Sequence, residues 1–205
     1  MHLEALNDKG KEIFPRLKEF KKFYLAGGTA LSLQIGHRIS VDFDFFCEDD
    51  ISKDLMPRVK KIFKGSGISV LVNNLDELTL IINGVKITFL KYPFPVLSNF
   101  ISYKGVSFLN VKEISATKAY TIGRRGSYKD YIDLYFAISK KYVSLNNIIK
   151  MAEKKYGDDF NSRLFLEQLV YFKDIECADI MFLNKKVKKE DLEKFFETEI
   201  KKIKL

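Results

Sequence analysis

Residues 23–46 of this chain read FYLAGGTALSLQIGHRISVDFDFF. The stretch opens with a short apolar run, Phe23–Ala26, which ends at Gly27 and Gly28, and Leu31 and Ile35 follow at helical spacing. This order predicts a strand, a tight turn and a helix. Paired glycines permit positive φ angles and close approach of a ligand, and the free N–H groups at the start of a helix attract an anion. The turn is therefore a candidate phosphate site.

The second half of the stretch alternates as a β-strand does. Val41, Phe43 and Phe45 are predicted to share one face, with Asp42 and Asp44 on the other. The rise of a strand puts the two acidic side chains about 6–7 Å apart at Cβ. Carboxylates at that spacing can converge on one divalent ion or on a two-ion cluster that supports phosphoryl chemistry.

Neither half is specific by itself, because a glycine pair is often only a turn and an Asp-x-Asp pair is often solvated surface. Together they are more selective. The motif Gly27-Gly28-Thr29, followed by His37-Arg38-x-Ser40-x-Asp42-x-Asp44-Phe45-Phe46, resembles the first motifs of the AbiEii/AbiGii-type nucleotidyltransferases. That bacterial and archaeal family belongs to the DNA-polymerase-β-like superfamily, and many of its members are toxins of toxin–antitoxin pairs.

A second match lies downstream. The segments Ala116–Ala119 and Lys129–Tyr135 resemble later family motifs, which present a lysine on one helix and Asp-x-x-Asp-Leu on the next. The resemblance implies that Lys118 faces the triphosphate, although a lone helical lysine is usually a snorkelling side chain. Asp133 would either complete the acidic cluster or orient Lys118. The plainer alternative is that Asp130 and Asp133 pair with Arg124, Arg125 or Lys129.

The resemblance implies an α/β fold with a nucleotidyltransferase-like mixed sheet flanked by helices. Residues 1–110 would form the α/β core and residues 111–205 a helical subdomain packed against it. The sheet is expected to contain residues 23–26, 41–47, 68–72, 78–82 and 85–90, with a hairpin turn at Asn83-Gly84. Residues 3–22 are predicted to form a helix that is kinked or broken at Pro15.

One position departs from the superfamily pattern. Members usually carry a third carboxylate on a strand beside the Asp-x-Asp strand, within an apolar-acid-apolar triplet, and here that triplet is Ile87-Thr88-Phe89. Three consequences are open: another carboxylate substitutes, the site holds one ion, or the enzyme is weak or inactive.

The implied reaction is the metal-dependent transfer of NMP from an NTP to a hydroxyl group. In it Gly27, Gly28 and Thr29 would cradle the β- and γ-phosphates, and Asp42 and Asp44 would hold Mg²⁺ or Mn²⁺. Lys118 would offset charge on the leaving pyrophosphate, with Asp133 as its catalytic partner. Arg38 and Ser40 complete the predicted nucleotide site, although Arg38 could instead hold Asp42 or Asp44 in place. The rival is an inactive protein of the same fold that binds nucleotide, RNA or a partner protein.

The acceptor is predicted from charge and resemblance together. Thirty-five Lys and Arg against twenty-seven Asp and Glu give a net charge of +8, which suits RNA, with a tRNA 3′ end favoured by the family. A lysine-rich composition is equally typical of a soluble or heat-adapted protein, and a small-molecule acceptor would use the same site. A cognate antitoxin is a further predicted partner. The acidic N-terminus and the absence of a long apolar run predict a cytoplasmic protein, and Cys47 and Cys177 are predicted to be free thiols.

Overall fold

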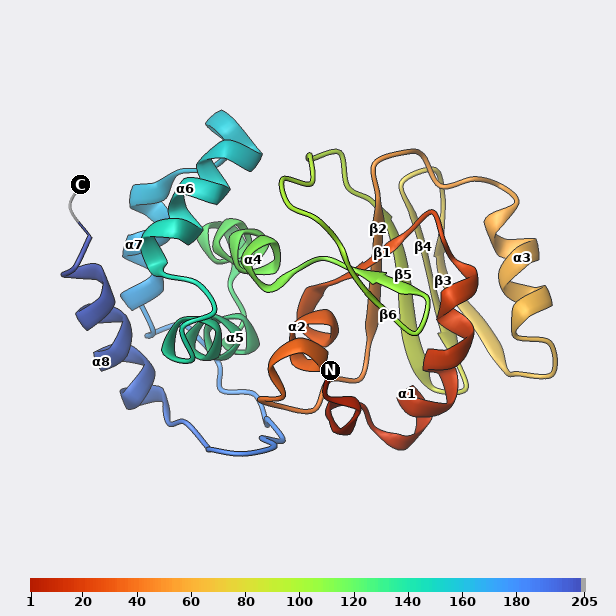
Figure 1. Ribbon diagram of the computed structural model, residues 1–205, viewed down its shortest axis with the longest axis horizontal. Helices are drawn as coiled ribbons and strands as arrows, with labels where there is room; N and C mark the ends of the chain where they lie inside the picture. The colour runs from red at the N-terminus through yellow and green to blue at the C-terminus, as the bar shows by residue number, and fades with distance from the viewer. Residues whose placement is uncertain (204–205) are drawn as a thin grey trace.

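The computed structural model describes residues 1–203 and contains a seven-stranded sheet of order β3-β4-β5-β2-β1-β7-β6 (Figure 1). The strands are β1 (Tyr24–Ala26), β2 (Phe43–Cys47), β3 (Ile68–Asn73), β4 (Glu77–Ile82), β5 (Val85–Lys91), β6 (Ile101–Tyr103) and β7 (Val106–Phe108). The sheet is mixed, since β2 runs parallel to β5 and β1 parallel to β7 while the other neighbours are antiparallel. The predicted α/β class and mixed sheet are confirmed, and the hairpin β6–β7 adds two strands to the expected set.

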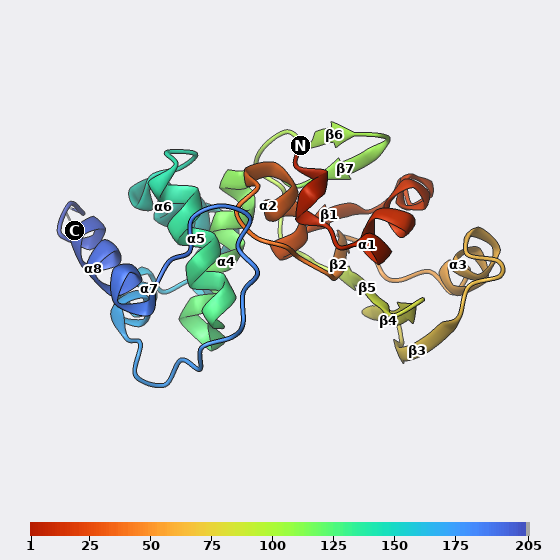
Figure 2. The same cartoon turned by 90° about the horizontal axis from the view of Figure 1, so that it is seen from below.

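The helices are α1 (Asp8–Ile13), α2 (Gly27–Ile35), α3 (Leu55–Ile62), α4 (Val111–Arg125), α5 (Tyr128–Ser139), α6 (Leu145–Tyr156), α7 (Ser162–Val170) and α8 (Lys189–Ile200), with 3₁₀ turns at Leu3–Ala5, Phe14–Glu19 and Gly157–Asp159. The helices from α4 onward gather on one side of the sheet, and α3 lies beyond its other end (Figures 1 and 2). Within residues 1–203, no helix combines the length and apolar character needed to cross a bilayer.

The long helix predicted for residues 3–22 is not continuous. The α-helical part ends at Ile13, directly before a 3₁₀ turn that carries Pro15 at its start. Proline has no N–H to donate and its ring crowds the preceding turn, so the helix is interrupted next to Pro15, as predicted. Phe14 and Phe20 beyond the break remain buried and contact aromatic rings of the sheet, among them Phe43 and Phe89.

The Asn83-Gly84 hairpin is confirmed. Ile82 pairs with Val85, and the two turn residues have φ angles of 49° and 84°. Two successive positive φ angles are typical of a type I′ turn, whose twist matches that of the strands it joins. This hairpin fixes the register of β5, the strand that lies directly beside β2.

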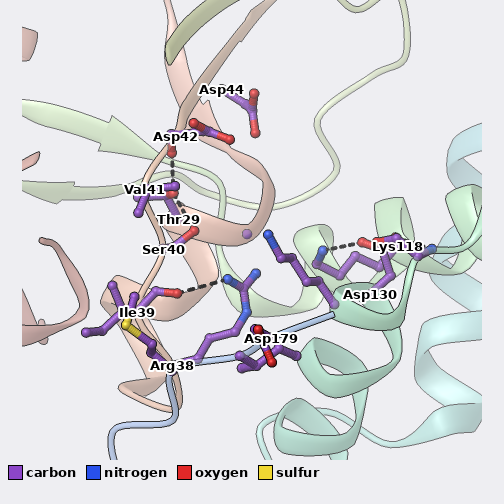
Figure 3. A pocket seen from close by; sticks show the side chains of 15 residues that line it. Thr29, Arg38, Ile39, Ser40, Val41, Asp42, Asp44, Lys118, Asp130 and Asp179 are labelled. Atoms are coloured by element: carbon purple, nitrogen blue, oxygen red, sulfur yellow. Dashed lines mark hydrogen bonds and ion pairs between the residues drawn. The ribbon is translucent and has the colours of Figure 1, made fainter. Parts of the chain in front are cut away.

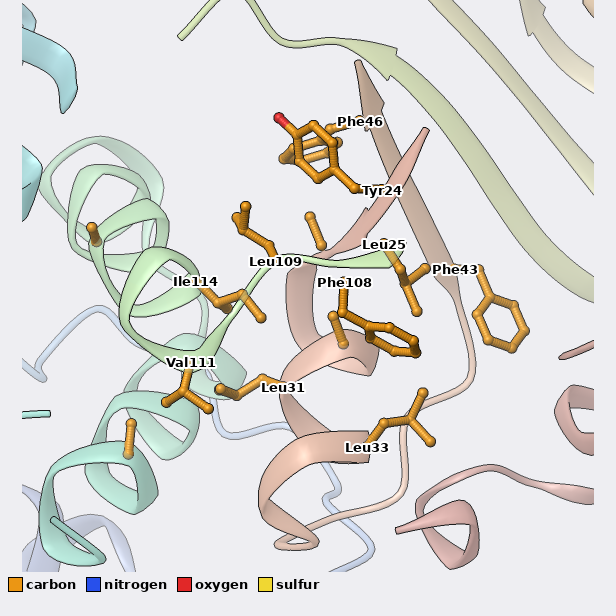
Figure 4. Packing of buried hydrophobic residues seen from close by; sticks show 14 of the residues in the cluster. Tyr24, Leu25, Leu31, Leu33, Phe43, Phe46, Phe108, Leu109, Val111 and Ile114 are labelled. Atoms are coloured by element: carbon orange, nitrogen blue, oxygen red, sulfur yellow. The ribbon is translucent and has the colours of Figure 1, made fainter. Parts of the chain in front are cut away.

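Helix α2 connects the sheet to the helical half of the molecule. Its Leu31 and Leu33 are fully buried in one cluster with Phe108 of β7 and with Val111 and Ile114 of α4 (Figure 4). Burying each such side chain contributes roughly 1.5–3 kcal/mol. The glycine turn at the start of α2 is therefore held against both the sheet and helices α4 and α5.

Both cysteines are free, Cys47 being buried at the end of β2 and Cys177 exposed in the connection between α7 and α8. The prediction of free thiols is confirmed.

Candidate active site

The glycine turn is shaped by what lies opposite it. Gly27 has a φ angle of 65°, and a Cβ atom added there would come within 2.6 Å of Oδ2 of Asp44. A Cβ atom added to Gly28 would collide with Nη2 of Arg38. Only glycine allows both the left-handed backbone and this close approach. The turn therefore lies directly against an acidic and a basic side chain.

Asp42 and Asp44 lie on either side of the start of β2. Asp44 is inside the strand, whereas Asp42 precedes it by one residue. Val41, which was predicted to share one strand face with Phe43 and Phe45, is 38% exposed while those two are buried, because the strand begins only at Phe43. That detail of the periodicity was wrong, yet both carboxylates border the same pocket.

Thr29 and Ser40 fix the segment that leads into β2. The Thr29 hydroxyl donates to the backbone carbonyl of Asp42 and lies 2.7 Å from the Ser40 hydroxyl. Both side chains are buried. Their observed hydrogen bonds therefore hold the backbone of Asp42 against the first turn of α2.

The electrostatic setting of Asp44 favours a cation. Burial against the glycine turn raises the pKa of Asp44; Lys86 counteracts this shift and the neighbouring Asp42 adds to it. Asp42 and Asp44 lie close together, and Asp44 is poorly solvated. A bound cation would stabilise the ionised form of both carboxylates.

Asp133 is the centre of a buried ionic cluster, the Asp133 cluster, formed with His37, Arg38 and Lys118. Its Oδ1 lies 2.7 Å from both His37 Nε2 and Arg38 Nε, and its Oδ2 lies 2.7 Å from Lys118 Nζ and 3.0 Å from Arg38 Nη2. The Asp133 side chain is completely buried. Burial alone would raise the pKa of Asp133, but Arg38 and Lys118 outweigh it and hold that pKa well below its usual range.

This geometry decides between the roles considered for these residues. Arg38 forms a two-pronged ion pair with Asp133, and not with Asp42 or Asp44. The ion-pair partner shared by Asp130 and Asp133 is Lys118, at 2.7 Å from each carboxylate. Asp133 is thus ion-paired with Lys118 and Arg38, as expected if it orients Lys118.

One cavity of about 290 Å³ brings most of the predicted residues together (Figure 3). Its walls include Gly28, Thr29, Arg38, Ser40, Asp42, Asp44 and Lys118. Gly27 and Asp133 do not line it, since Gly27 lies behind Asp44 and Asp133 behind the two cations. A carboxylate pair and two held cations therefore border one pocket beside a helix N-terminus, an arrangement that suits a metal-bound polyphosphate.

The third carboxylate is absent from the expected position. Thr88 of β5 is directly paired with Asp44 of β2, so the alignment places a hydroxyl where related enzymes carry an acid. Among residues 1–203, no three His, Cys, Asp or Glu side chains come together as a metal cluster. The carboxylates present fit one divalent ion and do not fit the three-acid arrangement that holds two.

A wall of the pocket comes from a segment that gave no signal in the sequence. Residues 171–188 connect α7 to α8, and Asp179, Ile180 and Met181 of this connection line the cavity. The segment is anchored by backbone hydrogen bonds from Ile39 N to Met181 O and from Leu183 N to His37 O. Contacts made by backbone atoms leave no residue pattern, and for that reason the sequence could not reveal them.

One family model and one curated relative match this chain. The model of the family described as "Nucleotidyl transferase AbiEii toxin, Type IV TA system" matches residues 11–93. An uncharacterised protein of Aquifex aeolicus is 35% identical over 182 residues, which cover 87% of this chain and 86% of that protein.

Two solved structures share the fold. The nucleotidyltransferase toxin MenT4 of Mycobacterium tuberculosis has a TM-score of 0.63 at 16% identity, covering 94% of this chain and 80% of its own. A Helicobacter pylori protein described as a candidate nucleotidyltransferase has a TM-score of 0.58 at 20% identity, covering 96% of both chains. The family-model match identifies the chain as a member of the AbiEii nucleotidyltransferase toxin family, and the two solved structures agree with this assignment in their fold.

Proposed function

We propose that this protein transfers NMP from an NTP to a hydroxyl group of RNA, at a tRNA 3′ end, and that it acts as the toxin of a toxin–antitoxin pair. The observation that carries the proposal is the single pocket in which Asp42 and Asp44 face the region held by Lys118 and Arg38. Family membership supports the chemistry, the toxin role and a cognate antitoxin as partner.

In the proposed complex the triphosphate lies along the glycine turn. The backbone of Gly28 and the side chain of Thr29 line the pocket and would border its β- and γ-phosphates, with Ser40 beside them, while Gly27 lies behind Asp44 and shapes the turn. Arg38 and Lys118 balance its negative charge, and Lys118 stabilises the pyrophosphate as it leaves. Asp133 keeps both cations in position before substrate arrives, so no side-chain ordering is needed at the moment of reaction.

Asp42 and Asp44 would hold Mg²⁺ or Mn²⁺. When bound, such an ion supplies positive charge to the phosphate under attack and aligns it with the incoming hydroxyl. The raised pKa of Asp44 fits this role, because a carboxylate that is costly to ionise in the free protein gains most from a cation.

The direct test is incubation of the protein with each labelled NTP, Mg²⁺ and total cellular RNA. Label from one NTP should appear in RNA, should require the divalent ion, and should be missing with Asp42→Asn. Label in a protein or small hydroxyl compound, with none in RNA, would contradict the proposed acceptor.

One observation favours a second function. Thr88 replaces the carboxylate usual in the superfamily, which suits a protein that binds nucleotide, RNA or a partner without turnover. Binding of nucleotide by a protein that transfers no label to any acceptor, under all four NTPs and either metal ion, would favour this alternative.

Gly27→Ala should reduce NMP transfer about 10²-fold, because its Cβ displaces the Asp44 carboxylate. The matched control is Gly65→Ala, since Gly65 has a φ angle of 84° but open space around it. Each variant should lose roughly 1–2 kcal/mol of stability from left-handed strain, measured by urea unfolding. Only Gly27→Ala should lose activity; equal turnover by the two variants would argue against a site at this turn.

RNA binding should weaken steeply as salt rises. Arg125 and Lys129 are exposed near the junction of α4 and α5, and Lys129 lines the pocket. Replacing both by alanine should lower the slope of log affinity against log salt by about 1.4–1.8, at roughly 0.7–0.9 per phosphate contact. Lys60→Ala with Lys61→Ala on α3 removes the same charge and should leave the slope unchanged, as measured by filter binding to tRNA. An equal change in both pairs would indicate a general effect of net charge.

A further inference from the structure

The strand beside the two carboxylates carries a threonine where a further acid was expected and a lysine two residues earlier. Thr88 of β5 is paired with Asp44, and Lys86, two residues earlier, projects from the same face of the strand. The Lys86 Nζ atom lies 3.6 Å from Oδ2 of Asp42. Strand β5 therefore offers the acidic pair a hydroxyl group and an ammonium group.

The nearest acid on the adjoining strand is already engaged. The Thr79 hydroxyl of β4 lies 3.2 Å from the Thr88 hydroxyl and 2.5 Å from Oε1 of Glu77. Glu77 is thus directed to Thr79, two strands away from Asp44. It does not substitute for the acid missing at Thr88.

The carboxylates that the protein itself supplies then limit the number of divalent ions. Asp42 and Asp44 together carry two negative charges, which one divalent ion neutralises. A pair of ions in a two-metal site lies about 3.5–4 Å apart, so a second ion would share the Asp42 carboxylate and meet the Lys86 ammonium at close range. The Lys86 ammonium repels an ion at that distance, and among residues 1–203 no third acid joins Asp42 and Asp44 in a metal cluster to offset this repulsion.

We propose that the site takes one divalent ion for each bound nucleotide, and that Lys86 occupies the place of the second ion. Lys86 acts as a positioning residue, because its ammonium group lies beside the Asp42 carboxylate and supplies positive charge there. This inference rests on the proposed function. It adds the number of divalent ions at the nucleotide site and the residue that sets this number.

The experiment counts Mn²⁺ by electron paramagnetic resonance with a non-transferable α,β-methylene NTP analogue. The protein and the analogue are mixed at equal concentrations far above their dissociation constant, so that nearly every protein molecule holds nucleotide and bound Mn²⁺ is counted per complex. The wild-type protein should hold one ion, and a ratio of two would overturn the inference. A protein that does not bind the analogue at all would instead overturn the proposed function, so the two failures are distinguishable.

Restoring the acid provides the second readout. The double variant Lys86→Ala with Thr88→Asp should raise the ratio from one to two, whereas Lys91→Ala should leave it at one. Lys91 is a matched control, since it lies on the same strand and pairs with Asp50, a carboxylate outside the pocket. A double variant that folds, binds the analogue and still holds one ion would contradict the assignment of the second position to Lys86 and Thr88.

Discussion

Asp44→Asn and Asp42→Asn should each lower NMP transfer by about 10³-fold or more. Loss of a carboxylate that holds the catalytic cation removes several kcal/mol of transition-state stabilisation, and about 1.4 kcal/mol corresponds to a factor of ten in rate. The measurement is the single-turnover rate with saturating NTP and Mg²⁺. Wild-type turnover in either variant would refute the assignment of the ion site.

Stability separates this effect from misfolding. Because burial raises the pKa of Asp44, its ionised form is disfavoured in the metal-free protein, and a neutral amide should be tolerated at least as well. Because the pKa of Asp44 is raised in the folded state, ionised Asp44 lowers the stability of the wild-type protein above that pKa, and this loss is recovered as pH falls through it. Any increase in stability caused by Asp44→Asn should therefore be greatest at neutral pH. Thermal melts without metal should therefore be unchanged or slightly higher for this variant. Asp50→Asn, an exposed acid just beyond β2 that pairs with Lys91, is the control and should retain full activity.

The parts of the site that could be predicted are those with a local pattern. The Gly27-Gly28 turn, the Asp42 and Asp44 pair and the Asn83-Gly84 hairpin each follow from residues close together in the sequence. The start of β2 was predicted two residues early because alternation continues into an extended segment that pairs with no strand. The β6–β7 hairpin was not predicted as a hairpin, because its strands have only three residues each and one of them, β6, is largely exposed.

Partners distant in sequence were harder to predict. Helical spacing puts Asp130 and Asp133 near one face of α5, but it does not reveal what that face meets. Arg38 lies 95 residues before Asp133. The sequence alone was consistent with Arg38 binding nucleotide or holding Asp42 or Asp44, and it did not show which cation Asp133 meets. Only the packing of α2 and α4 against α5 decides that these charges meet one another. The wall formed by Asp179, Ile180 and Met181 depends on backbone pairing and has no counterpart in the sequence.

Asp133→Asn should be the most destabilising conservative change in the site. The Asp133 carboxylate is the shared partner of Arg38 and Lys118, and both cations are nearly buried. Removing one partner of a buried ion pair leaves uncompensated charge and typically costs about 3–5 kcal/mol. For a protein of this size each kcal/mol lowers the melting temperature by roughly 2–4 °C, so a fall of about 10 °C is expected in calorimetry.

The effect should depend on pH in a defined direction. The depressed pKa of Asp133 stabilises the fold above the usual aspartate pKa of about 3.9, and this stability is lost as pH falls through the native value. The difference in the free energy of unfolding between wild type and Asp133→Asn should thus be largest at neutral pH and should disappear in strong acid. If this difference in stability stayed constant down to acidic pH, the Asp133→Asn substitution would be destabilising through packing and not through charge.

Two further variants separate the structural role of Asp133 from its role in transfer. Asp130→Asn is the matched control, since Asp130 is partly exposed and its loss leaves Lys118 paired with Asp133; it should cost only about 1 kcal/mol. Asp133→Asn leaves Asp130 as the acid that faces two nearly buried cations, Arg38 and Lys118. Adding Lys118→Met removes one of these cations and should recover part of the lost stability. It should not recover transfer, because the charge that balances the leaving pyrophosphate is then missing. A double variant no more stable than Asp133→Asn alone would mean that the Asp133–Lys118 pair does not carry the energy assigned to it, and that the fold depends instead on the pairing of Asp133 with Arg38.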